Sequence, residues 1–82
     1  MKLHIASPKE IILEDKEIKW FHAILDNGYP VSIYPNHAPL IGKLGPKEIK
    51  YRSGGKNYDI PITGGVMKVE NDHITCLIGD TK

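Results

Sequence analysis

The strongest constraint on this chain is the stretch 34–46, which reads Y-P-N-H-A-P-L-I-G-K-L-G-P. It holds three of the six prolines and two of the eight glycines, a density that excludes a helix or a long strand. Pro35 and Pro39 fix their own φ and favour extended conformations at the residues before them. The stretch therefore predicts a short, rigid loop with Asn36 and His37 at its tip. Apolar residues that need a packing partner follow the tip: Leu40, Ile41 and Leu44.

Short alternations of apolar and polar residues on both sides of this loop predict β-strands. Leu3 and Ile5 alternate with polar neighbours until Pro8 ends the ladder. The segment 9–25 could form a helix on propensity alone, but its isoleucines and aromatic residues favour two strands joined by a turn at 14–17. Further strands are predicted at 31–33, 49–52, 58–62, 66–70 and 73–78, with turns at 26–28, 53–56 and 71–72.

Regularly spaced turns between short strands predict an all-β fold. We expect a β-sandwich or flattened barrel of about eight to ten short, mostly antiparallel strands that forms a single domain over residues 1–82. Pro61 places its strand at a sheet edge or at a bulge. Nine residues that alternate with polar neighbours are expected to be largely buried: Leu3, Ile5, Ile33, Ile49, Ile60, Ile62, Val69, Ile74 and Cys76.

Composition excludes several classes of protein. The net charge is +1, from 11 basic and 10 acidic residues that are interspersed, so no basic stripe for nucleic acid is present. The longest apolar runs have three residues, too few to span a bilayer. No secretory signal follows Met1, and a single cysteine fits a reducing compartment. These features predict a cytoplasmic protein.

The residue patterns typical of a catalytic site or a metal site are not found in the sequence. The four histidines have no H-x-H or H-x-x-x-H spacing, and one cysteine cannot supply a thiolate set for zinc. Cys76 is expected to be a buried, unreactive residue. The pair Gly64-Gly65 lacks the lysine and hydroxyl of a phosphate-binding loop. We therefore expect no catalytic residue, no cofactor and no metal, and a domain that holds two other surfaces together.

Three motifs in order resemble the epsilon subunit of the F-type ATP synthases. They are L-H-I-A-S-P at 3–8, N-H-A-P-L at 36–40 with the later Gly45-Pro46, and G-G-V-M-K-V-E-N-D-H-I-T-C-L at 64–77. The resemblance implies the β-sandwich domain of a non-catalytic rotor subunit in the central stalk. Such a subunit links the gamma subunit to the c ring, supports the coupling of proton flow to ATP synthesis, and lies on the cytoplasmic face of the membrane only through the complex.

The resemblance also implies two interfaces. The gamma-subunit interface would comprise Asn36, His37, Ala38, Pro39, Leu40 and Ile41, with the apolar pair Leu40 and Ile41 buried against gamma and not in the chain's own core. The loop facing the c ring would comprise Asp26, Asn27, Gly28, Tyr29 and Pro30.

Two departures from the family pattern limit what is carried over. Tyr29-Pro30 stands where the family has glycines flanking an acidic residue, so a less ionic ring contact is expected. The family's C-terminal helical hairpin is absent from these 82 residues, so its restraint of ATP hydrolysis and its ATP binding are not transferred.

An alternative reading is a free-standing β-sandwich that binds a peptide or a carbohydrate through the stretch 34–46 and Trp20. Binding to the gamma subunit would distinguish the hypothesis of a rotor subunit from that of a free-standing binding module. An enzyme would instead need the loop to line a cleft that holds a perturbed titratable pair.

Overall fold

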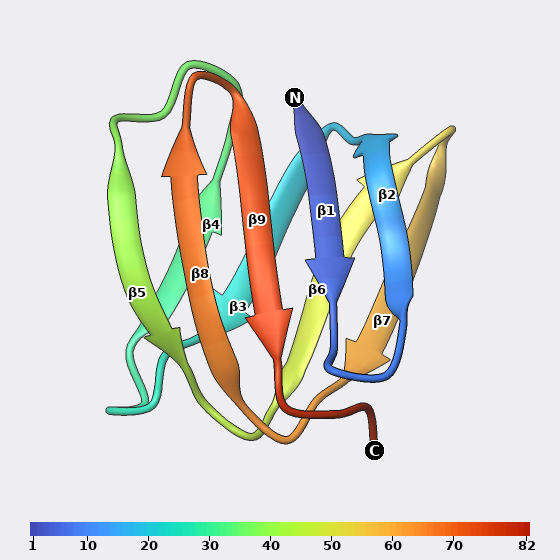
Figure 1. The fold of residues 1–82 in the computed structure, drawn as a ribbon. Coiled ribbons are helices and arrows are strands. Elements are labelled where there is room, and N and C mark those ends of the chain that lie inside the picture. Colours follow the sequence, from blue (N-terminus) through green and yellow to red (C-terminus); the bar gives the residue numbers. More distant parts are fainter.

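The computed structural model describes residues 1–82 and contains nine strands and no helix. The strands are numbered along the chain (Figure 1). Their bounds are β1 (Lys2–Ala6), β2 (Ile11–Glu17), β3 (Trp20–Ile24), β4 (Pro30–Ile33), β5 (Leu40–Leu44), β6 (Glu48–Ser53), β7 (Lys56–Pro61), β8 (Gly65–Glu70) and β9 (His73–Ile78).

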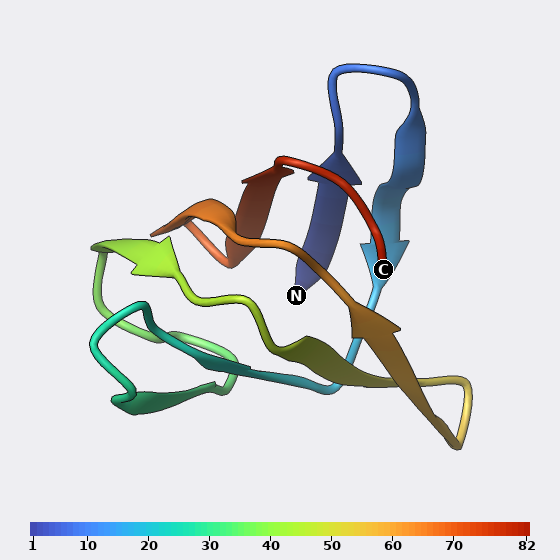
Figure 2. The same cartoon turned by 90° about the horizontal axis from the view of Figure 1, so that it is seen from below.

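The strands form two sheets packed face to face (Figures 1 and 2). The five-stranded sheet has the order β2-β1-β9-β8-β5, and the four-stranded sheet has the order β4-β3-β6-β7. Only β1 and β9 run parallel, and every other pair is antiparallel. The predicted all-β sandwich of short, mostly antiparallel strands is therefore confirmed.

The tight turns between strands follow from residues that tolerate positive φ. Gly54 and Gly55 have φ of 57° and 77° between β6 and β7, and Asn71 and Asp72 have φ of 51° and 58° between β8 and β9. Positive φ at both central residues is the requirement of a two-residue hairpin whose twist matches that of its strands. The turns predicted at these positions are confirmed.

The turn predicted at 14–17 is wrong, because these residues belong to β2. Asp15 has φ of 48° and lies at an irregularity in the pairing with β1, so a bulge absorbs the polar run without ending the strand. Since β2 is an edge strand, its charged side chains remain in water. The chain crosses to the other sheet at Ile18 and Lys19, whose N–H groups donate to the carbonyls of Met1 and Arg52, both at 2.8 Å.

The rigid loop is shorter than the sequence pattern predicts. It covers residues 34–39, since Leu40–Leu44 form β5 at the edge of the five-stranded sheet. Gly42 allows this strand to lie close to the other sheet, because a Cβ there would be 3.1 Å from Cδ2 of Leu25. Backbone hydrogen bonds then join the two sheets, from Asp26 N to Lys43 O and from Gly45 N to Ile24 O, both 2.9 Å.

The core fills the space between the sheets. Eight of the nine residues predicted to be buried are buried, and Ile60 is half-buried because β7 is an edge strand, as Pro61 predicted. Since the structure contains no helix, it has none that could span a membrane. The core also contains seven residues that were not among the nine predicted to be buried: Ile18, Phe21, Ala23, Leu44, Tyr51, Met67 and Ile78.

Candidate interaction surfaces

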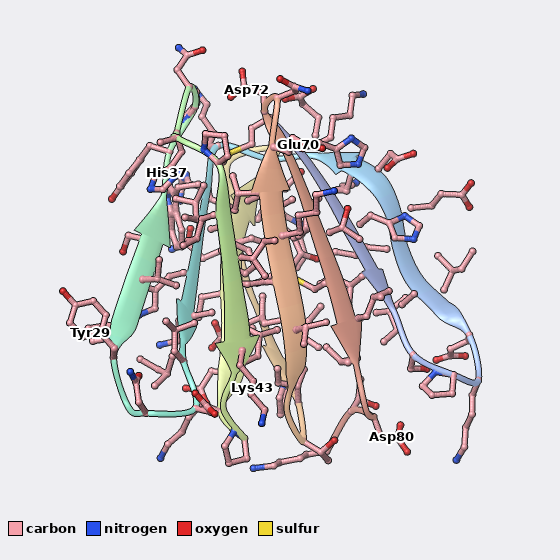
Figure 3. The ribbon with its side chains drawn as sticks, turned by 60° about the vertical axis from the view of Figure 1, so that its left-hand side comes forward. Tyr29, His37, Lys43, Glu70, Asp72 and Asp80 are labelled. Carbon is pink, nitrogen blue, oxygen red and sulfur yellow. The ribbon has the colours of Figure 1, made fainter.

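The loop 34–39 lies at one end of the sandwich, beside the turn between β8 and β9 (Figures 1 and 3). All six residues are exposed. Asn36 adopts φ of 67°, and its N–H donates to Asp72 Oδ1 at 2.6 Å. The His37 ring nitrogen Nδ1 is 2.7 Å from the carbonyl oxygen of Ala38. The loop therefore presents its tip to solvent, as a stiff projection and not as the wall of a deep cleft.

The last two residues of the predicted gamma-subunit interface point to opposite sides of β5. Leu40 pairs with Val69, is half-buried and packs against the core, whereas Ile41 is 78% exposed. Successive side chains of a strand alternate between faces, so only one of the two can face outward. The expectation that Leu40 lies outside the chain's own core is therefore wrong. Asn36, His37, Ala38, Pro39 and Ile41 remain exposed, and their contact with gamma stays a prediction.

Ile41 belongs to an exposed apolar patch that the sequence analysis missed. Val66 on β8 and Leu77 on β9 face each other across the ladder and are 47% and 55% exposed. Together with Ile41 they line a shallow groove of about 340 Å³ on the outer face of the five-stranded sheet. We call Ile41, Val66 and Leu77 the apolar patch. Its signal in the sequence is that Val66-Met67 and 76–78 are apolar at consecutive positions, hence on both faces of their strands.

The loop predicted to face the c ring lies at the opposite end of the sandwich, where Figure 3 labels Tyr29 and Lys43. All of its residues are exposed, and Tyr29 is 67% exposed. The turn is closed by hydrogen bonds from Gly28 N to Leu25 O and from Tyr29 N to Asn27 Oδ1, both 2.9 Å. Asp26 lies 3.9 Å from Nζ of Lys43, so its carboxylate is partly balanced. The loop is thus a compact turn with one aromatic ring on its surface.

Titratable groups gather at one further place, on the outer face of the five-stranded sheet. Asp15 Oδ1 is 2.8 Å from His73 Nε2 and 3.7 Å from His4 Nδ1. A polar hollow of about 280 Å³ beside it is lined by Lys68, Glu70, Asn71, His73 and Thr75. No group of three or more His, Cys, Asp or Glu side chains has an arrangement that could hold a metal ion.

Cys76 is fully buried, and burial raises the pKa of its thiol to about 12. The thiolate, which is the nucleophilic form, is thereby disfavoured.

Trp20 and Ile41 lie on different sheets, and Trp20 is half-buried on the outer side of β3 because Phe21 and Ala23 fill its inner side.

Comparison with known proteins identifies the family. Residues 1–81 match the family described as the ATP synthase, Delta/Epsilon chain, beta-sandwich domain. The chain belongs to this family. The resemblance seen in the three motifs is thereby confirmed, and the two exposed surfaces described above are surfaces of an epsilon-type β-sandwich.

Curated relatives carry the name ATP synthase epsilon chain. The chain is 32% identical over 76 residues to that of Desulforamulus reducens, covering 93% of this chain and 56% of the relative. It is 30% identical over 77 residues to that of Solibacter usitatus, covering 94% and 56%. It is 28% identical over 82 residues to the chloroplastic chain of Pinus thunbergii, covering 100% and 58%. The chain thus spans somewhat more than half the length of these relatives.

Two solved structures have the same fold. One is the mitochondrial ATP synthase of Euglena gracilis, described as OSCP/F1/c-ring, with a TM-score of 0.90 and 19% identity over 100% of this chain and 52% of the matched chain. The other is the central stalk and c ring of the mitochondrial ATP synthase of Tetrahymena thermophila, with a TM-score of 0.81 and 17% identity over 99% and 64%. At such identities the likeness concerns the fold.

Proposed function

We propose that this chain acts as a non-catalytic epsilon-type subunit in the central stalk of an F-type ATP synthase. In this role the single β-sandwich of residues 1–82 links the gamma subunit to the c ring and supports the coupling of proton flow to ATP synthesis. The chain is held at the cytoplasmic face of the membrane through the complex. The family membership and the central-stalk context of the Tetrahymena structure support this assignment.

The observation that carries the proposal is the apolar patch. Its three side chains are about half or more exposed, on a sheet whose other outward residues are mostly polar. Exposed apolar groups gathered on one face mark an interaction surface. The patch adjoins the predicted gamma-facing loop through Ile41, which follows Pro39 and Leu40 directly. We therefore assign the loop 36–39 and the apolar patch together to gamma.

The second surface is assigned to the c ring by its position. The loop 26–30 lies at the end of the sandwich opposite to the loop 34–39 (Figure 1), so one rigid body can touch two partners at once. Its carboxylate is paired with Lys43, and its exposed ring belongs to Tyr29. A ring contact made by this loop would rest on an aromatic side chain and backbone polar groups more than on free charge.

The test is direct binding of the 82-residue chain to the purified cognate gamma subunit by isothermal titration calorimetry. A dissociation constant in the nanomolar to micromolar range, which corresponds to about 8 to 12 kcal/mol, is expected. A second titration uses detergent-solubilised c ring together with the complex of chain and gamma. No saturable heat with gamma at tens of micromolar protein would refute the proposed function, and capture of a peptide or glycan alone would support the alternative of a free-standing binding module.

A further inference from the structure

One hydrogen bond connects the gamma-facing loop to the rest of the molecule. The Asn36 N–H donates to Asp72 Oδ1 at 2.6 Å. Apart from the hydrogen bonds of the strand ladders, this is the one that joins residues 34–39 to another segment. The other hydrogen bond of the loop, between His37 and Ala38, is internal to it. Pro35 and Pro39 have no N–H to offer. Apart from its covalent attachment to β4 and β5, the loop is thus held against the five-stranded sheet by a hydrogen bond to a single side chain.

Asp72 is itself well fixed. It occupies the second central position of the turn between β8 and β9 with φ of 58°, a conformation that Asp tolerates better than most residues. Its carbonyl oxygen accepts a hydrogen bond from Lys2 N at 2.9 Å, which ties the turn to β1. Figure 3 shows Asp72 and His37 at the same end of the sandwich. The backbone that carries the carboxylate is therefore held in place, and a hydrogen bond to a charged group is stronger than one between neutral groups.

We propose that Asp72 is a positioning residue, whose carboxylate holds the loop 34–39 in the orientation in which it binds its partner. The inference rests on the proposed function for the identity of that partner, the gamma subunit. The prolines stiffen the loop internally, but they do not fix it against the sheet. Without the carboxylate the loop would need to be ordered at the moment of binding, and that ordering weakens association.

The turn offers a matched pair of variants. Asp72→Gly removes the carboxylate and keeps a residue that accepts positive φ. Asn71→Gly makes the same backbone change one position earlier, at φ of 51°, and its side chain has no hydrogen bond to lose. Asp72→Asn keeps an acceptor oxygen without the charge. A difference in behaviour between the two glycine variants therefore measures the effect of losing the carboxylate and not the effect of the backbone change in the turn.

The first measurement is amide hydrogen exchange by NMR on the 82-residue chain. We expect the Asn36 amide to exchange at least about tenfold faster in Asp72→Gly than in Asn71→Gly, with the amides of β8 and β9 unchanged between the two. Asp72→Asn should retain most of the protection. Equal exchange at Asn36 in the two glycine variants would overturn the proposal.

The second measurement is affinity for gamma. Asp72→Gly should bind about tenfold more weakly than Asn71→Gly at an equal melting temperature, since the folded core is the same. Native affinity despite faster Asn36 exchange would also overturn the inference, because the position of the loop would then not matter for binding. If the unaltered chain does not bind gamma, the proposed function fails, and the exchange experiment still decides whether Asp72 positions the loop.

Discussion

Replacing each of two neighbouring residues on β5 by aspartate should separate folding from partner binding. Leu40 faces the core and is half-buried, whereas Ile41 faces solvent and is 78% exposed. The two changes are chemically alike and adjacent in sequence. They differ only in the face of the strand that receives the charge, so any difference in their effects measures what each face contacts.

Stability should respond mainly at Leu40. Leu40→Asp removes packing against the core and brings a charge toward it, which should lower the free energy of unfolding by about 2 to 4 kcal/mol. Ile41→Asp loses only β-propensity and a small buried fraction, so the loss should be about 1 kcal/mol or less. Urea denaturation of the 82-residue chain, followed by circular dichroism, measures both values.

Binding to gamma should respond at Ile41. Full burial of an isoleucine side chain is worth about 1.5 to 3 kcal/mol, and 78% of this one is available, so losing it costs about 1 to 2 kcal/mol. A buried aspartate without a partner adds to this. The total should reach about 2 kcal/mol or more, which is about a thirtyfold loss of affinity.

The matched control is Tyr29→Asp, which places the same charge on an exposed apolar residue at the opposite end of the sandwich. It should leave gamma affinity unchanged and weaken the proposed contact with the c ring. If Ile41→Asp destabilises the free chain as much as Leu40→Asp does, the two faces of β5 are assigned wrongly. If Ile41→Asp binds gamma with native affinity, the apolar patch is not the gamma surface.

Three further predictions concern the stability of the chain. Ile74→Ala should lower the free energy of unfolding by about 2 to 4 kcal/mol in urea denaturation, because Ile74 is fully buried, and a loss below about 0.5 kcal/mol would contradict this. Gly65→Ala should lower the free energy of unfolding by at least about 2 kcal/mol in the same assay. Gly65 has φ of 156°, and a Cβ there would overlap the carbonyl oxygen of Leu77 and lie 2.7 Å from Cα of Ile78. Near-native stability of this variant would show that β8 can shift. Burial raises the pKa of the Cys76 thiol from 9.0 to about 12, so its contribution to stability is complete below pH 9 and is lost as the pH rises toward 12. Cys76→Ala should therefore lose less stability than the unaltered chain between pH 9 and pH 11, and parallel pH profiles of the melting temperature would refute this assignment.

Much of the fold could be predicted from the sequence because its turns have local causes. The glycine pair at 54–55 and the pair Asn71-Asp72 are residues that accept positive φ, and each lies between alternating segments. The turn at 14–17 was predicted wrongly because a run of charged residues also suits an exposed edge strand with a bulge. Whether a strand lies at an edge depends on its distant neighbours, so the local pattern could not distinguish the two.

The candidate interaction surface was harder to predict than the fold. Alternation separates the two faces of a strand, but it does not say which face is covered when both carry apolar residues. Leu40 and Ile41 are equivalent in the sequence, and their difference arises from the pairing of Leu40 with Val69 and from the close approach of Gly42 to Leu25. These contacts join segments far apart in the chain, so the direction of each side chain is a property of the assembled sandwich.

The hydrogen bond between Asn36 and Asp72 could not be predicted from the sequence either. Asn36 and Asp72 are each predictable as turn residues, because both tolerate positive φ. Asn36 follows Pro35, and Asp72 follows Asn71, which are also residues typical of turns. Their contact depends on β5 pairing with β8, which brings the start of β5 and the turn after β8 to the same end of the five-stranded sheet. Only then can a carboxylate 36 residues away accept the hydrogen bond of a loop amide. The hydrogen bond is local in space and remote in sequence, so the fold had to be known before Asp72 could be given a role in presenting the loop.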